Sequence, residues 1–515
     1  MASALNPGTL GVGLVLAALT SVVLLFRIYA RYKLGYWKRR GVEQLPSSDL
    51  IFGNFKDAVL FRTAPGSHLG VLHKAATTDA PYLGFYIFHK PCILLRDPDA
   101  IKRITIRDFE NFSDRHFAGS VQKDSIGMKN LFGLKNPAWK YLRAKITPTL
   151  TRGKLREMFP LMIETGGPMM DFLRAQKVDD SGVKLVDAQE LSYKYATDLI
   201  ASVALGTKMD SFNYPNAEFT KAGVYLGEFF HGFKRMVALV TVFFMPELVE
   251  LIGSPMLFNS KFVRKVFWNA VDKREKEGFK RGDFIDSLVQ LKNGEQNDVY
   301  KFEGENLLYQ SGTFFSGFES SSTTVSFTLM ELANNPEYQS RVRDDVEKSI
   351  KKHGLTYEAF NDMKYLDQAL AEGIRLHPPV STIDRYTRED YTIPGTDIVL
   401  EKGTPVYISL YGLQEDPRFF DQPEVYNPER FADGVKVSDA YIPFGIGPRM
   451  CVGMKVGQLH AKIVIAMVLQ DYEISQQAKN KSVLDSRSTF TAAADGILKK
   501  TKQVEEKLVK ISEYH

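Results

Sequence analysis

The feature that most constrains this 515-residue chain is a short glycine-rich stretch near its C-terminus, FGIGPRMCVGM, at residues 444–454. It contains Cys451, one of only two cysteines in the sequence. The flanking glycines let the backbone approach something bulky and flat, and Arg449 places a cation two residues before the thiol. The pattern that follows predicts a helix whose first turn begins at Cys451, and a helix N-terminus and loop amides both stabilise a thiolate.

The surrounding sequence limits what this thiol can do. A catalytic thiol needs a nearby base and a redox pair needs a second cysteine, and the loop supplies neither. No other Cys or His stands at ligand spacing, so a single thiolate ligand to iron in a macrocycle fits best. Two cysteines also exclude a disulfide scaffold and a zinc site built from cysteine pairs. Cys92, in an apolar run, is expected to be a small buried hydrophobe.

The loop resembles the haem-binding signature of the cytochrome P-450 family, F-x-x-G-x-R-x-C-x-G, and every fixed position is filled. The resemblance implies that Cys451 is the axial thiolate ligand of the haem iron. It also implies that Phe444 packs near the sulfur and that Arg449 pairs with a haem propionate. Three further residues match propionate-binding positions of the family by their location: Trp139, Arg143 and Arg385.

A long helical pattern of about 30 residues begins near residue 305 and carries Gly317, Glu319 and Ser320 in its middle. Gly and Ser inside a helix often mark a kink, and an acid next to an alcohol can relay protons to bound oxygen. This stretch resembles the family's oxygen-binding groove, A/G-G-x-D/E-T, with Ser316 and Ser320 where Ala and Thr are usual. Serine keeps the hydroxyl but loses the methyl that limits its rotamers. Proton delivery is therefore expected to be retained, and the coupling efficiency stays open.

A charged network is predicted from AEGIRLHPP and YNPERF. Glu372 and Arg375 stand three residues apart on one helix face and can pair, and Arg430 follows farther on. In the family such a trio forms a buried network near the proximal haem face. Its role is structural, because breaking one member would strand a buried charge. Position relative to the motifs also gives candidates for the substrate pocket: Phe117, Phe132, Phe315, Val380, Thr382 and Ile383.

The N-terminus differs from the rest of the chain. Residues 9–26 carry no charge and approach the length of about 20 apolar residues that crosses a bilayer. Basic residues follow this run rather than precede it, which favours a retained anchor over a cleaved signal peptide. We expect a membrane anchor at residues 1–30, a basic and polar hinge at 31–50 and a catalytic domain at 51–515. The hinge keeps only Pro46 of the family's proline cluster, so how rigidly the anchor sets the tilt of the body stays open.

The remaining sequence predicts one large, mainly helical domain with a minor β-sheet, which the resemblance identifies as the cytochrome P-450 fold. The hydrophobic content of 44% is enough for a large core, and a net charge of +5 from dispersed basic residues does not suggest a nucleic-acid binder. Extended runs are predicted on both sides of His89 and within residues 391–410. The apolar segment 229–258, interrupted by Pro246, is predicted not to span a membrane. It is either core or a lid whose apolar edge enters the membrane interface.

The resemblance is nearest to microsomal P-450s of the insect detoxification branch. It implies a monooxygenase that inserts one atom of O2 into lipophilic substrates, with haem b as cofactor and electrons from NADPH. The implied partners are NADPH–cytochrome P-450 reductase, cytochrome b5 as a second donor, and the endoplasmic reticulum membrane, with the catalytic domain on the cytosolic face. We expect Lys135, Lys140 and Lys455 to line the reductase-docking face. Plant toxins or insecticides are the implied substrates.

Three alternatives stay open at this point. The substrate could be an endogenous lipid or hormone instead of a xenobiotic. The protein could be a haem-thiolate isomerase or dehydratase that needs no reductase, although the anchor and the Glu319–Ser320 pair argue against this. It could also be a non-catalytic protein that sequesters haem or hydrophobic molecules. Dependence on NADPH, and turnover with a reductase present, distinguish these alternatives.

Overall fold

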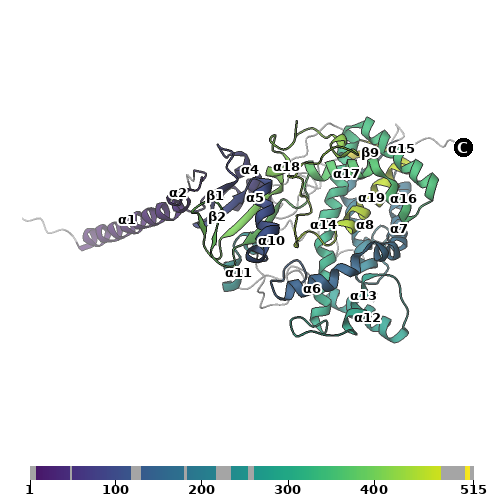
Figure 1. Ribbon diagram of the computed structural model, residues 1–515, viewed down its shortest axis with the longest axis horizontal. Coiled ribbons are helices and arrows are strands. Elements are labelled where there is room, and N and C mark those ends of the chain that lie inside the picture. The colour runs from purple at the N-terminus through teal and green to yellow at the C-terminus, as the bar shows by residue number, and fades with distance from the viewer. Residues whose placement is uncertain are drawn as a thin grey trace, which may run out of the picture.

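The computed structural model describes residues 7–46, 49–117, 129–178, 183–215, 233–252, 260–476 and 505–510. A single long helix, α1 (Pro7–Leu34), extends away from a large body that carries sheet on the side near α1 and helices beyond it (Figure 1). The other α-helices are α2 (Tyr36–Arg39), α3 (Lys56–Val59), α4 (Pro65–Lys74), α5 (Pro98–Lys102), α6 (Ala138–Ile146), α7 (Arg152–Ala175), α8 (Ala188–Ala204), α10 (Phe233–Phe244), α11 (Pro246–Ile252), α12 (Ser260–Glu277), α13 (Phe284–Lys292), α14 (Glu305–Asn334), α15 (Pro336–His353), α16 (Tyr357–Asp362), α17 (Lys364–Leu376), α18 (Leu410–Gln414) and α19 (Met454–Asp471).

Helix α1 is long and apolar enough to cross a membrane over Leu14–Leu34, and its side chains there are almost entirely exposed. It ends at Leu34, a few residues beyond the expected end of the anchor. The chain that follows packs onto the body, because Trp37 is fully buried and its backbone N–H donates to the Tyr86 hydroxyl at 3.0 Å. The helix therefore joins the body through packed residues, with Ala30 also buried at the junction.

The largest sheet has the strand order β1-β2-β7-β4. Its hairpin, β1 (Tyr82–Ile87) and β2 (Lys90–Leu95), confirms the two extended runs predicted around His89. Strand β7 (Pro405–Ser409) runs parallel to β2 and antiparallel to β4 (Thr382–Tyr386). Cys92 is fully buried in this sheet, and burial raises the pKa of its thiol to about 12, which fits the predicted apolar role. The smaller sheets are β5 (Tyr391–Thr392) with β6 (Val399–Leu400), and β3 (Val183–Asp187) with β9 (Glu505–Lys510) and β8 (Tyr472–Gln476).

The helical part is built around α14, which runs the predicted length of 30 residues. Helices α8, α17 and α19 lie against it, and their apolar faces share one large core with α6 and α7 (Figure 1). Such burial of apolar surface contributes about 25 cal/mol per Å². This packing brings residues from distant parts of the chain to the two sides of α14.

The apolar segment around Pro246 forms two helices, because this proline begins α11 and separates it from α10. Val240 and Phe244 of α10 are buried against the sheet, whereas Val237 and Leu248 are exposed. The described part of the segment therefore contributes to the core and also keeps an exposed apolar edge.

Candidate active site

The cysteine loop is a tight turn pressed against a neighbouring segment. The Cys451 N–H donates to the Phe444 carbonyl at 2.8 Å, and the Met450 N–H donates to the Gly447 carbonyl at 3.0 Å. Gly447 has a φ of 76°, and a Cβ added there would lie 2.2 Å from the Thr105 carbonyl oxygen. Only glycine fits this position, since it tolerates both the left-handed backbone and the close approach.

The helix after the loop begins later than predicted. α19 starts at Met454, and Cys451 lies in the turn before it, so the prediction of a first helical turn at Cys451 is wrong. The turn is kept out of the helix by the loop's own backbone hydrogen bonds, and the Gly453 N–H still points at the thiol and favours its charged form. The thiol is therefore held by loop amides close to the N-terminus of a helix.

The Cys451 side chain is accessible to solvent, yet burial by the surrounding protein raises the pKa of its thiol. Both facts fit a thiol that faces an internal space. The positive charge of Arg143 acts in the opposite direction and favours the thiolate. Arg143 also donates from Nη1 to the Met450 carbonyl at 2.9 Å, so it braces the loop beside the cysteine.

Arg449 is buried and firmly placed. Its Nε donates to the Ser113 carbonyl at 2.7 Å and its Nη2 to the Leu134 carbonyl at 2.9 Å. Its guanidinium stacks on the Trp139 ring, 3.9 Å from the centroid, which is a cation–π contact. Its Nη1 is buried without a hydrogen-bond partner within the described ranges. One donor of a fixed guanidinium is thus left for a ligand.

Two more guanidinium groups gather near Arg449. Arg385 donates from Nη1 to the Asp384 carbonyl at 2.6 Å, and Arg115 lies 3.3 Å from the Asp384 carboxylate. The Nε of each is buried and lacks a partner in the part of the chain that the structure describes. Burial, followed by repulsion from Arg115, lowers the pKa of Arg385 to about 9. Burial and repulsion from Arg115 and Arg385 lower the pKa of Arg449 to about 8.

This cluster fits an anionic group. Three guanidinium groups face only two carboxylates here, those of Asp114 and Asp384, and each retains a buried donor without a partner in the described structure. Buried donors are costly when unpaired and are usually satisfied by a ligand or water. A dicarboxylate such as the propionate pair of haem would satisfy them and relieve the repulsion. Sequence analysis missed Arg115, which belongs to no motif and lies far along the chain from Arg449.

The middle of α14 offers space where the oxygen-binding groove was predicted. Among the side chains that the structure describes, none comes within 4 Å of a Cβ added at Gly317, and this glycine is half-buried. The Ser320 hydroxyl donates to the Gly317 carbonyl at 3.2 Å, and Glu319 is 2% exposed. The side chains of Phe315 and Ser316 lie outside those that the structure describes.

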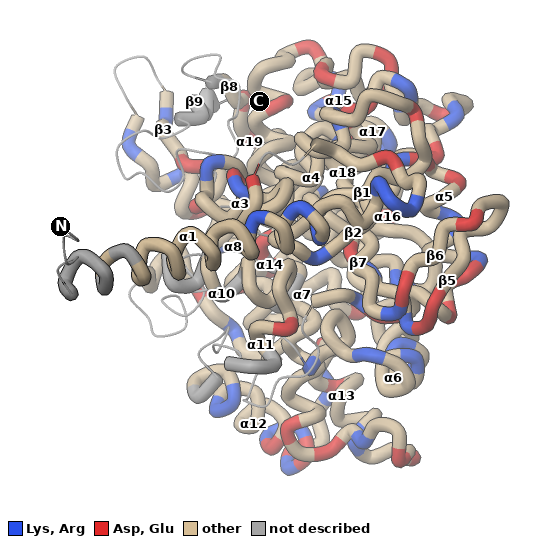
Figure 2. Tube along the Cα trace, turned by 90° about the vertical axis from the view of Figure 1, so that its left-hand side faces the viewer, with Lys and Arg blue, Asp and Glu red and all other residues tan. Residues whose placement is uncertain are grey.

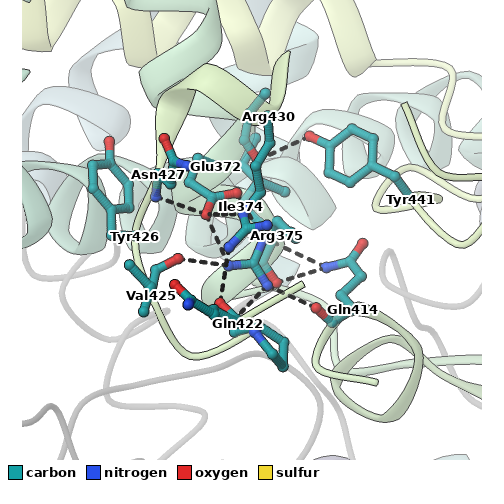
Figure 3. Close-up of polar contacts among 12 residues, drawn as sticks. Glu372, Ile374, Arg375, Gln414, Gln422, Val425, Tyr426, Asn427, Arg430 and Tyr441 are labelled. Atoms are coloured by element: carbon teal, nitrogen blue, oxygen red, sulfur yellow. Dashed lines mark hydrogen bonds and ion pairs between the residues drawn. The ribbon is translucent and has the colours of Figure 1, made fainter. Parts of the chain in front are cut away.

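The predicted charged network is present as a buried cluster (Figure 3). Glu372 and Arg375 are both fully buried and form a two-pronged ion pair, with N···O distances of 2.6 and 2.8 Å. Arg430 approaches the same carboxylate at 3.2 Å, and the Asn427 N–H donates to it at 2.9 Å. The remaining donors of Arg375 reach the backbone carbonyls of Gln414, Pro423 and Val425. The network ties α17 to the loops that follow it.

The described substrate-pocket candidates lie in two places: Phe117 and Phe132 before α6, and Val380, Thr382 and Ile383 in or just before β4. Phe117 is buried and packs against Phe132, with 5.0 Å between ring centroids. Ile383 shares one face of β4 with Arg385, and its side chain lies 3.6 Å from a Cβ built at Gly445 in the cysteine loop. Thr382 points to the other face, where its hydroxyl donates to the Gly66 carbonyl at 3.0 Å. The structure therefore gives Thr382 a place in sheet packing instead of beside Ile383.

Val380 is half-buried just before β4. Phe444 is also half-buried and packs against the helical core at the start of the cysteine loop. Trp139 is buried with its ring 5.8 Å from that of Phe109, and with Arg449 on its face it supports the arginine cluster.

A shallow groove of 610 Å³ lies between α6 and Pro448 of the cysteine loop. Its lining is mainly apolar and comes from α6, from Thr147, Pro148 and Thr151 after it, from Phe109 and Glu110, and from this one residue of the loop. Lys140 lines this groove and is exposed, and Lys455 is exposed on the first turn of α19. Lys135 is half-buried, with its ammonium over the Tyr386 ring. Figure 2 shows blue Lys and Arg positions along α6.

A family model, described as Cytochrome P450, matches residues 46–503. The chain belongs to the cytochrome P450 family. It is 37% identical to "Cytochrome P450 6k1" of Blattella germanica over 95% of this chain and 98% of that protein. It is 34% identical to "Probable cytochrome P450 6g2" of Drosophila melanogaster, over 90% of this chain and 93% of that protein. The family assignment confirms the mainly helical fold predicted from the sequence.

Family membership makes this protein a cytochrome P450 monooxygenase that uses haem iron, O2 and NADPH through a redox partner and acts on lipophilic substrates. When bound, the haem supplies the iron at which O2 is activated. The residues present fit that group, because the thiol is accessible and lies two residues from Arg449, and because Arg115, Arg385 and Arg449 each keep a buried donor without a partner in the described structure.

Proposed function

We propose that this protein is a membrane-anchored monooxygenase of the endoplasmic reticulum that oxidises lipophilic xenobiotics, such as plant toxins or insecticides, with electrons from NADPH–cytochrome P450 reductase. The observation that carries the proposal is the meeting of the Cys451 thiol with the arginine cluster of Arg115, Arg385 and Arg449. Cytochrome b5 is proposed as a second electron donor. The insect relatives, matched over nearly their whole length, support the detoxification role.

Each residue of the site has a proposed task. Cys451 binds the iron as thiolate, and Arg143 braces its loop through the Met450 carbonyl. The arginine cluster holds the propionates, with Arg449 kept in place by the Trp139 ring. Gly317 leaves room for a small ligand on the inner face of α14. Glu319 and Ser320 deliver protons at that face, since the serine hydroxyl can donate and accept in turn.

The anchor places the enzyme on its membrane. The apolar part of α1 is exposed along its length, and Arg and Lys residues gather where it meets the body (Figure 2). Positive residues next to a membrane span stay on the cytosolic side. We therefore place the catalytic body in the cytosol, within reach of a membrane-bound reductase.

The groove outside the cysteine loop is the proposed docking site for the reductase. It is lined by Pro448, three residues before Cys451, and by Lys140, which pairs with Glu110 at 3.3 Å. Lys140 and the exposed Lys455 would supply positive charge for an acidic partner. Charge reversal at Lys135, Lys140 and Lys455 together is expected to weaken reductase affinity and flatten its salt dependence. Unchanged affinity and salt dependence would exclude this docking face.

An aromatic and aliphatic wall formed by Phe117, Phe132, Val380 and Ile383 favours a lipophilic substrate. The same wall would suit an endogenous lipid or hormone, which remains the second candidate. Screening both classes for substrate-induced changes of the ferric haem spectrum separates them. A xenobiotic that binds and is turned over supports the first, and turnover of lipids alone supports the second.

The first test of the proposal is the reduced, carbon monoxide-bound difference spectrum of the full-length membrane protein and of Cys451→His. We expect a strongly red-shifted Soret band that the variant loses. An ordinary haem–CO band in the folded parent protein would exclude Cys451 as the ligand. Reconstitution with reductase and NADPH then separates oxygenation from isomerase chemistry or mere sequestration, neither of which consumes NADPH.

A further inference from the structure

His116 is a buried histidine that stands between a residue of the arginine cluster, Arg115, and a residue of the proposed substrate wall, Phe117. It is 5% exposed, and no step of the proposed chemistry uses its ring. A buried imidazole needs partners for both of its nitrogens, because an unpaired polar group inside a protein is costly. The partners of these nitrogens show which parts of the fold hold the ring.

Both ring nitrogens of His116 have partners from the large sheet. Lys90 of β2 places its Nζ 3.0 Å from Nε2, and Tyr407 of β7 places its hydroxyl 3.0 Å from Nδ1. An ammonium group can only donate, so Nε2 accepts, and the proton of the neutral ring lies on Nδ1 and is donated to the Tyr407 hydroxyl oxygen. Burial lowers the pKa of His116, which keeps the ring neutral at neutral pH.

The two partners of the ring are themselves held by the helices around Pro246. The Lys90 ammonium pairs with the Glu247 carboxylate of α11. Glu247 Oε1 lies 3.6 Å from Nε2 of His116, which is too far for a hydrogen bond, so Lys90 bridges the carboxylate and the imidazole. Tyr407 is stacked against Phe244 of α10, with 6.0 Å between the ring centroids. The ring is thus fixed by β2 and β7 and, through them, by α10 and α11.

The backbone that carries this ring also carries Arg115. The His116 N–H donates to Asp384 Oδ2 at 2.6 Å, and the Phe117 N–H donates to the same oxygen at 3.2 Å. Arg115 reaches the other oxygen of Asp384 through one nitrogen at 3.3 Å, and its guanidinium lies 4.1 Å from the centroid of the Phe132 ring. A single-pronged ion pair fixes a guanidinium less well than a two-pronged one. The placement of Arg115 therefore depends on its backbone, and the ring of the next residue holds that backbone in place.

We propose that His116 is a positioning residue of the haem site: its ring, held by two strands of the large sheet, fixes the backbone that presents Arg115 to a haem propionate. A guanidinium binds a carboxylate well only when its planar donors are in place, so a displaced Arg115 would hold the propionate less well. The inference rests on the proposed task of the arginine cluster. It also connects α11 to the haem site, because the Lys90 ammonium is shared between Glu247 and His116.

The test uses the full-length, haem-loaded protein and compares the parent with His116→Leu, Arg115→Leu and the double variant. The matched control is His68→Leu. His68 is also a buried histidine with a partner on each ring nitrogen, the Asn54 carbonyl at 2.8 Å and the Thr63 hydroxyl at 3.0 Å. Two quantities are measured: the rate at which ferric haem passes to excess apomyoglobin, and the propionate bending frequency in the resonance Raman spectrum. Both report how the propionates are held, and neither depends on turnover.

We expect His116→Leu to speed haem loss about tenfold, because a hydrogen bond to a charged group that is weakened in the variant accounts for a factor of this size. We also expect it to shift the propionate frequency in the same direction as Arg115→Leu does. The double variant should lose haem no faster than Arg115→Leu, because His116 acts through Arg115. His68→Leu should keep the propionate frequency of the parent protein.

The outcomes distinguish a failure of the positioning role from a failure of the arginine cluster. If Arg115→Leu changes neither quantity, the proposed task of Arg115 is wrong, and the inference is wrong with it. If Arg115→Leu changes both quantities while His116→Leu changes neither, or if the two effects add, the positioning role of His116 is excluded. The role is also excluded if His68→Leu shifts the propionate frequency as far as His116→Leu does.

A second variant covers the case in which His116→Leu does not bind haem. Tyr407→Phe keeps the aromatic ring against Phe244 but removes the oxygen that accepts the Nδ1 proton of His116. We expect this variant to bind haem and to shift the propionate frequency in the same direction as Arg115→Leu. A propionate frequency equal to that of the parent protein in Tyr407→Phe would overturn the proposal.

Discussion

Replacing Glu372 by Gln tests whether the buried network holds the fold through charge. The substitution keeps the size and one carbonyl oxygen but removes the negative charge that faces Arg375 and Arg430. Arg375 is fully buried, so its positive charge would be left without a counterion inside the protein. Breaking a buried ion pair in this way costs about 3–5 kcal/mol.

The contacts place this variant near the lower end of that range. Arg375 keeps carbonyl acceptors at 2.8 Å from Gln414, 2.7 Å from Pro423 and 3.3 Å from Val425. Hydrogen bonds to charged groups are worth about 1.5–3 kcal/mol each, so these carbonyls stabilise the stranded guanidinium in part. We expect a loss of about 3 kcal/mol, which is a large share of the 5–15 kcal/mol typical of native proteins.

The matched control is Arg430→Gln. Arg430 lies at the edge of the network with a partly exposed side chain, and a second of its nitrogens reaches the Gln422 carbonyl at 2.8 Å. Its removal should cost only about 1 kcal/mol. Urea unfolding of both variants, followed by far-UV circular dichroism and by the carbon monoxide complex, measures the difference. Equal urea midpoints for the two variants would show that leaving Arg375 without a counterion carries no extra cost in stability.

Three further predictions follow from single sites. Gly447→Ala should abolish haem binding, measured as haem content, because its Cβ would lie 2.2 Å from the Thr105 carbonyl oxygen; full haem content in this variant would contradict the loop geometry. Burial lowers the pKa of His460 to about 3, below about 6.5 in the unfolded chain. The stability that neutral His460 provides is therefore lost as pH falls from about 6.5 toward 3, and His460→Phe should show a weaker fall in urea midpoint over that range. Glu247→Gln breaks the ion pair with Lys90 that ties α11 to β2. If the segment around Pro246 is the lid considered from the sequence, lipophilic ligands should then bind faster in stopped-flow spectra, and an unchanged rate would exclude that role of the ion pair.

The parts of the site that lie close together in sequence could be predicted from it. The cysteine loop, the pair of Glu372 and Arg375, and Gly317 with its acid and alcohol each occupy a few consecutive residues, and local geometry sets their form. Helix α14 could also be predicted, because its helical sequence pattern continues without a break over 30 residues. These features needed no knowledge of distant contacts.

The remaining features depend on contacts across hundreds of residues. Arg115 joins the site because Asp384, far along the chain, binds it, and no spacing rule connects the two. His116 is held by Lys90 and Tyr407 only because β2 and β7 are neighbours in the sheet. The start of α19 was misplaced by three residues because backbone hydrogen bonds within the loop compete with helix formation, and sequence patterns locate helix ends poorly.

Strand β4 shows how one register serves two sides of the site. Its pairing with β7 sets Ile383 opposite Ile408 and Arg385 opposite Val406. Alternation then turns Ile383 and Arg385 toward the cysteine loop, while Asp384 faces away and accepts hydrogen bonds from the backbone N–H groups of residues 116 and 117. A slip of one residue would exchange these faces. Arg385 would then leave the arginine cluster and Ile383 would leave the proposed substrate wall together, so the proposed chemistry depends on the register of this strand.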